Sequence, residues 1–357
     1  MWRLVTAAGN DIGELLPGFL LVYTRTNVGH PNFTYPGVDD RDLFANVAAQ
    51  AAAADRSGFD TVLLMDHFYQ LPMLGQPDAY MLECYSMLAA LAGATSNVRL
   101  GALVTGNTYR NPAILAKTVT TLDIISGGRA QLGIGAGWFD VEHEAFGVEF
   151  NTFTERFEKL EEALQIILPM LRDERPTLDG KHYQVKNAIN QPKPISKIPV
   201  MIGGSGEKKT LRLVAQYADE SNLTSTAEEL PRKLDALAGH CERLGRDRSE
   251  ISVSQAVNVV IAPTHDEAFA EFSRFLGDRG MDVSTMDDAT LDMVKAMVVM
   301  GDPDEVGERI ATIVSHGLDG ITCSLPGNGH NPERVELLGE VATQALGLSR
   351  AGGQTDA

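Results

Sequence analysis

Residues 59–67, with the sequence FDTVLLMDH, are the most informative about the fold of this chain. This stretch follows a Ser-Gly breaker, and its largely apolar first part is typical of a strand that is buried on both faces of a parallel sheet. The apolar run stops abruptly at Asp66 and His67. In an α/β barrel, ligands bind at the carboxyl ends of such strands. If the rest of the chain forms such a barrel, this pair lies on its functional face.

On both sides of this stretch, candidate strands alternate with candidate helices. Asn111 before Pro112 and Thr152 before Glu155 are typical helix starts, the first with proline at the first helical position and the second a capping box. This alternation, repeated about eight times, predicts a (β/α)8 TIM barrel rather than an open sheet. The candidate strands are residues 19–23, 59–65, 98–104, 130–136, 199–202, 219–223, 251–261 and 320–325.

The barrel is expected to occupy residues 28–346 as a single domain. Residues 1–27 fit the alternation poorly, so we predict an extension outside the fold, and we predict a flexible tail at 347–357. Residues 175–197 and 277–300 interrupt the alternation. Loops at the carboxyl ends of barrel strands commonly carry extra elements. We therefore predict insertions at that face, the first with a short hairpin.

Composition bounds the class of function. The net charge of −18 and the pI of about 4.8 oppose a nucleic-acid partner, because phosphate binding needs concentrated Lys and Arg. No apolar run is long enough to cross a membrane. Cys84, Cys241 and Cys323 lie far apart without a CxxC pair, which favours small buried residues in a reducing cytoplasm over disulfides or a zinc cluster. We expect a cytoplasmic protein that acts on a small molecule.

Two glycine clusters follow candidate strands. Residues 133–138, GIGAGW, end in Trp where the dinucleotide fingerprint needs Gly, and residues 203–210, GGSGEKKT, lack the Gly-Lys pair of a P-loop. The second cluster nevertheless places small residues before a candidate helix, where backbone N–H groups favour an anion. It therefore predicts a phosphate site, with a plain tight turn as the alternative. The four residues concerned are Gly203, Gly204, Ser205 and Gly206.

The pair Asp66 and His67 has two interpretations. It is either a helix cap with a surface histidine or a functional pair in which His67 exchanges a proton. Glu142 and His143, after the candidate strand at 130–136, could reach the same mouth. These side chains could also hold a metal in a barrel hydrolase, although no HxH motif follows the first strand. We expect no metal site.

Together these motifs resemble those of the luciferase-like oxidoreductases of the bacterial luciferase superfamily, most closely the branch that uses the deazaflavin coenzyme F420. The resemblance covers residues 31–346. It is carried by four motifs in order, which are DHF at 66–68, VTGNTYRNP at 104–112, GAGW at 135–138 with Glu142 and His143, and GGSGE at 203–207.

The resemblance implies a hydride transfer between F420 and a small organic substrate, with His67 facing the reacting carbon. It further implies a non-proline cis peptide at Leu103–Val104 and a homodimer. In the sugar-phosphate dehydrogenase branch a glutamate stands where this chain has Trp138, which puts that substrate in doubt. The cofactor-binding residues that the resemblance and the motifs imply are Asp66, Leu103, Val104, Gly106, Ala136, Gly137, Glu142, Gly203, Gly204, Ser205 and Gly206.

Three other functions stay open at this point. A monooxygenase of the same superfamily would use FMN and oxygen. A metal-dependent TIM-barrel hydrolase would retain zinc or manganese. A cofactor carrier would bind F420 without turnover. A titration with F420 and FMN side by side separates the first of these from the deazaflavin enzyme.

Overall fold

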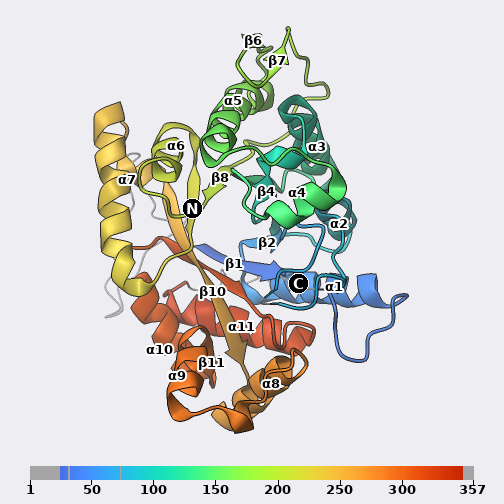
Figure 1. Cartoon of the computed structure of the whole chain (residues 1–357), viewed down its shortest axis with the longest axis vertical. Helices are drawn as coiled ribbons and strands as arrows, with labels where there is room; N and C mark the ends of the chain where they lie inside the picture. Colours follow the sequence, from blue (N-terminus) through green and yellow to red (C-terminus); the bar gives the residue numbers. More distant parts are fainter. Residues whose placement is uncertain (1–24, 31–32, 73, 349–357) are drawn as a thin grey trace, which may run out of the picture.

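A closed ring of parallel strands forms the centre of the protein (Figure 1). The structure is a computed structural model, and it describes residues 25–30, 33–72 and 74–348. The last strand pairs back with the first, so that Val28 lies opposite both Val62 and Cys323. This confirms the predicted (β/α)8 barrel. In ring order the eight strands are β1 (Arg25–His30), β2 (Thr61–Leu64), β3 (Arg99–Ala102), β5 (Ala130–Gly135), β8 (Val200–Gly203), β9 (Glu220–Leu223), β10 (Ser252–Ile261) and β12 (Gly320–Ser324).

Helices surround the ring, and neighbouring helices such as α3 and α5 pack against each other (Figure 1). The outer helices are α1 (Leu43–Ser57), α2 (Cys84–Leu91), α3 (Pro112–Ile125), α5 (Phe153–Leu171), α6 (Thr210–Tyr217), α7 (Leu230–Leu244), α10 (Pro303–Val314) and α11 (Pro332–Ala345). The additional elements are β4 (Thr105–Gly106), α4 (Asp140–Phe146), β6 (Leu178–Asp179), β7 (Gln184–Val185), α8 (His265–Gly277), α9 (Asp288–Ala296), β11 (Val299–Gly301) and the short 3-10 turns Asn107–Tyr109, Ala227–Glu229, Arg248–Glu250 and Val283–Thr285.

Local capping chemistry sets several helix starts. Asn111 accepts hydrogen bonds from the first backbone N–H groups of α3, whose first residue is Pro112. Thr152 and Glu155 form a reciprocal capping box at α5. Both starts are as predicted, and each satisfies N–H groups that have no partner inside the helix.

The barrel core is apolar toward the helices and partly polar inside the ring. All residues of β2 and β5 are buried. Inside the ring the Nδ2 atom of Asn222 donates to Ser254 Oγ and Thr322 Oγ1, both at 2.9 Å. Asn27 Nδ2 also donates to Thr322 Oγ1, at 3.2 Å. The amide N–H groups of Asn27 and Asn222 thus find hydroxyl acceptors inside the ring, as buried donors require.

The beginning of the barrel differs from the sequence prediction. The predicted first strand, residues 19–23, lies outside the described residues. The strand that fills this place is β1, with the sequence RTNVGH, and it hydrogen-bonds to both β2 and β12. Residues 25–27 therefore belong to the barrel, and the predicted boundary after residue 27 is too late. Because β1 contributes Asn27 to the polar interior, it lacks the apolar run by which the other strands are recognised.

The two predicted insertions lie in different places. The segment 277–300 follows β10 at the carboxyl face and contains α9, while β11 extends the sheet beside β10. The segment 175–197 joins α5 to the amino end of β8, and its β6–β7 hairpin is antiparallel. Backbone N–H groups of the hairpin donate to Glu162 of α5, and Asn190 donates to Thr120 of α3. This insertion therefore packs on the outside of the barrel rather than at the carboxyl face.

Within the described part of the chain, no helix is both long and apolar enough to cross a membrane. The three cysteines are free thiols and each is buried, as predicted.

Candidate active site

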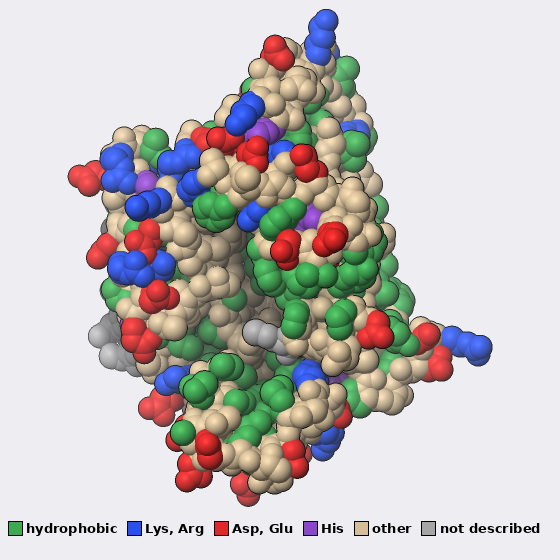
Figure 2. Space-filling view, viewed as in Figure 1, with side chains coloured by type: hydrophobic (Ala, Val, Ile, Leu, Met, Phe, Trp, Pro, Cys, Tyr) green, Lys and Arg blue, Asp and Glu red, His purple; other side chains and the backbone are tan. Residues whose placement is uncertain are grey.

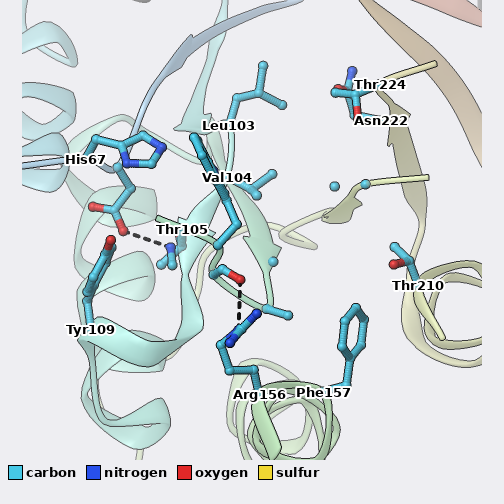
Figure 3. Close-up of a pocket in the computed structure, with 18 of the residues that line it drawn as sticks. His67, Leu103, Val104, Thr105, Tyr109, Arg156, Phe157, Thr210, Asn222 and Thr224 are labelled. Atoms are coloured by element: carbon cyan, nitrogen blue, oxygen red, sulfur yellow. Dashed lines mark hydrogen bonds between the residues drawn. The ribbon is translucent and has the colours of Figure 1, made fainter. Parts of the chain in front are cut away.

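A cavity of about 430 Å³ opens at the carboxyl ends of the barrel strands, and Figure 2 shows this face hollowed. Its volume lies in the range of small-molecule sites. Figure 3 shows residues from several strand ends pointing into it. Its walls are Asp66 and His67 after β2, Leu103–Gly106 and Tyr109 after β3, Gly135–Trp138 after β5, Gly203 and Gly204 after β8, Asn222 and Thr224 from β9 and the loop after it, Ala256 of β10, and Phe153, Arg156, Phe157 and Thr210 from α5 and α6.

The structure brings most of the predicted site residues together. Asp66 and His67 share this one cavity with Gly203 and Gly204, although they come from separate strands. Leu103, Val104, Gly106, Ala136 and Gly137 also line it. The predicted residues Ser205 and Gly206 are not among the lining residues. The Ser205 hydroxyl instead accepts from Thr224 N at 2.8 Å and donates to Thr224 O at 2.9 Å, which ties the loop after β8 to the loop after β9.

Glu142 stands behind His67 and does not line the cavity. Its carboxylate is fully buried, and Oε2 lies 2.9 Å from His67 Nδ1. The Tyr109 hydroxyl donates to Oε2 at 2.5 Å, and the backbone N–H groups of Tyr69, at 2.8 Å, and of Phe68 donate to Oε1. The prediction that Glu142 contacts the cofactor is therefore corrected, since its oxygens are engaged by the loop that carries His67. The place of Glu142 in the sequence does not indicate these partners, because they come from distant parts of the chain.

The four donors determine the ionisation of Glu142. Burial alone would raise the pKa of the Glu142 carboxyl group. The hydrogen bonds from His67, Tyr109 and Tyr69 together lower it by more than burial raises it, so the pKa of Glu142 lies below its ordinary value. The ionised carboxylate can only accept, so His67 Nδ1 must carry a proton. In neutral His67 the other ring nitrogen, Nε2, is then a hydrogen-bond acceptor. Burial and the carboxylate raise the pKa of Tyr109, which keeps its hydroxyl a donor.

Asp66 lines the cavity but has its own partners. Its Oδ2 atom accepts from Gly106 N at 3.0 Å and from Arg110 Nη1, and its Oδ1 atom accepts from Arg110 Nη2 at 2.9 Å. Burial raises the pKa of Asp66, while the charge and hydrogen bonds of Arg110 oppose this shift. The guanidinium also donates to Glu83 at 2.8 Å. The pair ties the loop after β2 to the turn after β3, so Asp66 holds the cavity wall in place.

Val104 rises from the cavity floor between two glycines. The Leu103–Val104 peptide bond is cis, as the resemblance implied. A Cβ atom placed on Gly135 or on Gly203 would lie 2.8 Å from a Val104 methyl group. Side chains at these two positions would therefore displace Val104, which explains the glycine at each strand end. The result is an apolar ridge in the middle of the cavity (Figure 3).

Aromatic side chains form the wall next to His67. The ring centroid of Trp138 lies 5.7 Å from that of His67, and Phe139 lies 5.8 Å from it. Trp138 also stacks on Phe139 at 5.1 Å. His143 does not join them at the cavity, because its Nδ1 donates to the carbonyl of Phe139 and its Nε2 accepts from Thr108, each at 2.7 Å. His143 therefore anchors α4.

The glycine turn for which an anion site is predicted lies at the opposite end of the cavity. Helix α6 begins at Thr210, and no side chain caps its first N–H groups. Arg156 lines the cavity on this side, donating to Gly137 O at 3.2 Å, and Figure 3 shows it near Phe157 and well apart from His67. Lys209 Nζ lies 5.1 Å from the ring centroid of Phe153, at the rim. The N–H group of Leu211 already donates to the carbonyl of Gly206 at 3.0 Å, so the N–H groups before it, together with the nearby cations, are the ones that suit a phosphate.

Sequence reasoning missed several lining or supporting residues. Tyr109 and Arg110 lie inside the quoted motif at 104–112 and could have been flagged by it. Arg156, Asn222 and Thr224 carry no local signal, because only the ring of strands brings them to the cavity. Among the residues that the structure describes, no three His, Cys, Asp or Glu side chains converge as metal ligands would.

Comparisons with known proteins give a consistent result. The sequence profile of the luciferase-like monooxygenase family matches residues 25–320. The chain is 30% identical over 307 residues to an F420-dependent glucose-6-phosphate dehydrogenase of Microbacterium testaceum, which covers 80% of this chain and 89% of that protein.

Solved structures share the architecture. The F420-dependent tetrahydromethanopterin reductase from Methanopyrus kandleri matches with a TM-score of 0.72 at 20% identity, over 91% of this chain and 99% of that one. An F420-dependent secondary alcohol dehydrogenase in complex with an F420-acetone adduct matches with a TM-score of 0.71 at 19% identity, over 91% and 99%. At such identities these matches establish the fold alone.

Proposed function

The chain belongs to the luciferase-like monooxygenase family, and on that premise we propose that it is an oxidoreductase that transfers a hydride between coenzyme F420 and a small organic substrate. The observation that carries the proposal is the single cavity that has a proton-accepting imidazole, His67, at one end and the glycine turn Gly203–Gly204 at the other. A deazaflavin coenzyme that carries a phosphate needs a proton-exchanging group near its redox ring and a binding turn for its phosphate, and the two ends of this cavity offer one of each. The F420 dependence of the related dehydrogenase from Microbacterium testaceum supports this choice of cofactor.

The middle of the cavity suits a flat ring. The Val104 side chain stands between Gly135 and Gly203, where any Cβ atom would crowd it. We assign this apolar ridge as the support of the deazaflavin ring, which when bound supplies two-electron hydride chemistry. Asn222 offers polar groups at the edge, although its Nδ2 already donates to Ser254 and Thr322.

The end near α6 suits the phosphate. We assign Gly203, Gly204 and Thr210 as its cradle, because the first N–H groups of α6 lack a side-chain cap. Arg156 and Lys209 add positive charge at the same end. We therefore expect a deazaflavin without its phosphate to bind about tenfold or more weakly than F420, since charge-assisted hydrogen bonds contribute about 1.5–3 kcal/mol each.

The His67 end suits proton transfer. Glu142 holds the Nδ1 proton, so Nε2 is the atom that accepts or returns a proton of the substrate. Asp66 and Arg110 hold the wall from which His67 projects. The aromatic rings of Trp138 and Phe139 lie beside His67 at this end.

A binding titration tests the cofactor assignment. Oxidised F420 and FMN are titrated side by side, and the expected result is tighter binding of F420. His67→Ala should lower kcat about 10²–10⁴-fold, the usual share of a general acid or base, and should leave the dissociation constant of F420 nearly unchanged. Tighter binding of FMN would assign the chain to the flavin monooxygenases instead. Unchanged turnover in His67→Ala would remove His67 from the chemistry.

We further propose a homodimer that forms through α3. Ile114 and Ile125 are exposed on this helix, and Ile195 is exposed beside it, where its backbone N–H donates to Asp123. Exposed apolar groups that cluster in this way are typical of protein interfaces. Ile114→Asp with Ile125→Asp should halve the mass measured by light scattering, whereas Leu244→Asp on α7 serves as the matched control. A mass that is unchanged by the double substitution would argue against this interface.

A further inference from the structure

We infer that Asn258 of β10 and Ser324 of β12 form a specificity-determining wall, which binds an uncharged hydrogen-bonding group of the substrate such as an amide, a carbonyl or a hydroxyl. The inference rests on the proposed function and locates the substrate within the same site. It follows from the register of the strands, from polar atoms that have no partner, and from the distribution of charge.

The strand register turns both side chains toward the inside of the ring. In the parallel ladder between β10 and β12, Ala256 lies opposite Thr322, and Asn258 lies opposite Ser324. Ala256 lines the cavity, and side chains two positions apart on a strand point to the same side. Asn258 and Ser324 therefore face inward, at a level nearer the mouth of the barrel than Ala256.

A glycine separates Ser324 from the strand that leads to His67. Gly29 of β1 lies opposite Ser324 on one side and opposite Leu63 of β2 on the other. A Cβ atom on Gly29 would lie 2.9 Å from Ser324 Oγ, so the hydroxyl occupies the space that this glycine leaves inside the ring. Neighbouring strands lie about 4.8 Å apart, which places β12 about 10 Å from β2. One small molecule can therefore reach both Ser324 and His67.

Polar atoms on this side of the cavity have no partner in the protein. The side chains of Asn258 and Ser324 are half-buried, and within the described part of the chain neither has a hydrogen-bond partner. Asn222 of the neighbouring strand β9 is 2% exposed and lines the cavity. Its Nδ2 donates to Ser254 and Thr322, while its Oδ1 has no donor among the described residues. A buried acceptor without a donor is costly, so this side of the cavity is built to receive hydrogen bonds from a ligand.

The charge around the wall favours an uncharged group. The loops that follow β9, β10 and β12 contain neither Lys nor Arg. They are residues 224–229, 262–264 and 325–331. Among the described lining residues the cation is Arg156, and Figure 3 shows it well apart from Asn222. Arg274 and Arg279 line a separate cavity of about 70 Å³, which shares no described lining residue with the first. A carboxylate or phosphate at the wall would lose its hydration without gaining a cation, which is costly.

The proposed place of the cofactor leaves this wall to the substrate. The support for the ring is Val104 after β3, which stands between Gly135 of β5 and Gly203 of β8. The proposed phosphate end lies at β8 and α6. In the order of the ring, β10 and β12 lie across from β3 and β5. The wall therefore faces the cofactor ring across the cavity, on the side where a substrate has room.

Isothermal titration calorimetry with benzamide and benzoate tests the inference without turnover. The two probes have nearly the same size and shape, but benzamide is uncharged and benzoate is an anion. F420 is titrated first, and the saturated protein is then titrated with each probe. We expect the dissociation constant of benzamide to be about tenfold or more below that of benzoate, because the anion loses its hydration at a wall without a cation.

Variants of the wall show whether the probe binds there. Asn258→Ala and Ser324→Ala should each raise the dissociation constant of benzamide about two- to tenfold, the share of one hydrogen bond, and should leave that of F420 unchanged. Ser252→Ala is the matched control, because Ser252 lies on the same face of β10 at its other end. Asn258→Lys should lower the dissociation constant of benzoate about tenfold or more, because it supplies the missing cation. Such a gain of binding cannot result from a loss of folding.

The outcomes separate this inference from the proposed function. If F420 binds but benzoate binds as tightly as benzamide, or benzamide does not bind, the role of the wall is overturned and the proposed cofactor stands. The same holds if the alanine variants leave the binding of benzamide unchanged. If they weaken F420 as much as benzamide, the wall belongs to the cofactor and its assignment to the substrate is wrong. If F420 does not bind at all, the proposed function fails, and the assignment to the substrate fails with it.

Discussion

Replacing Glu142 with Gln should reverse the polarity of His67 while leaving the shape of the site unchanged. The carboxylate of Glu142 receives two backbone N–H groups at Oε1 and His67 Nδ1 with the Tyr109 hydroxyl at Oε2. Backbone N–H groups can only donate, so the amide oxygen of the glutamine must occupy the Oε1 position. Its NH₂ group then points at Nδ1. His67 must accept this hydrogen bond, and its proton moves to Nε2.

The size of the effect follows from this change of tautomer. An Nε2 atom that carries the proton cannot accept one from the substrate, so the general-base contribution of about 10²–10⁴-fold is lost. The comparable change of Asp to Asn in a Ser-His-Asp triad lowers kcat about 10⁴-fold. We therefore expect kcat of Glu142→Gln to fall by about 10²–10⁴-fold. The dissociation constant of F420 should change less than about twofold, because Glu142 does not line the cavity.

Three measurements check this reasoning. Steady-state turnover gives kcat, a fluorescence titration gives the F420 dissociation constant, and ¹⁵N NMR of the imidazole reports which ring nitrogen of His67 carries the proton. Glu144→Gln is the matched control, because Glu144 is exposed on the same helix. A normal kcat in Glu142→Gln would refute the role of Glu142. A low kcat together with an unchanged tautomer would show that the loss has a cause other than the polarity of His67.

Three further changes test the wall, the fold and the floor. Arg110→Ala leaves the buried carboxylate of Asp66 without its cation, so the free energy of unfolding measured in urea should fall by about 3–5 kcal/mol. A loss below about 1 kcal/mol would contradict the importance of this ion pair. Asp55 accepts from three backbone N–H groups, and although burial raises its pKa, these bonds lower it below the ordinary 3.8. This stabilisation is present above the unfolded-state pKa and is lost as the pH falls through the lower folded-state pKa. Asp55→Asn should therefore lower the free energy of unfolding at pH 7, and the difference from the unaltered protein should shrink in acid. A difference in the free energy of unfolding that does not depend on pH would contradict this reasoning. Gly203→Ala places a Cβ atom 2.8 Å from a methyl group of Val104 and should weaken F420 binding about 5–100-fold, and adding Val104→Ala should recover part of the loss, which a titration of both variants measures.

The amino-acid sequence was enough to predict the alternation of strands and helices and the position of Asp66 and His67 at the end of a buried strand. Each of these depends on residues that are close together in the chain, such as the apolar run at 59–65 or the cap at Asn111. The same local pattern failed for β1, whose buried polar residues Thr26 and Asn27 interrupt any apolar run. A strand is recognised by its pattern only where its environment is uniform.

The partners of each acidic residue became known only from the folded arrangement of the strands. Glu142 and His67 are 75 positions apart, and Arg110 and Asp66 are 44 apart, so the partners meet only when the ring closes and α4 folds back over the loop after β2. Residue types and their spacing along the chain indicate that acids and a histidine are available at one face. Which oxygen meets which donor, and therefore which ring nitrogen of His67 is free to accept a proton, depends on distances that are set by the packing of separate strands around the barrel.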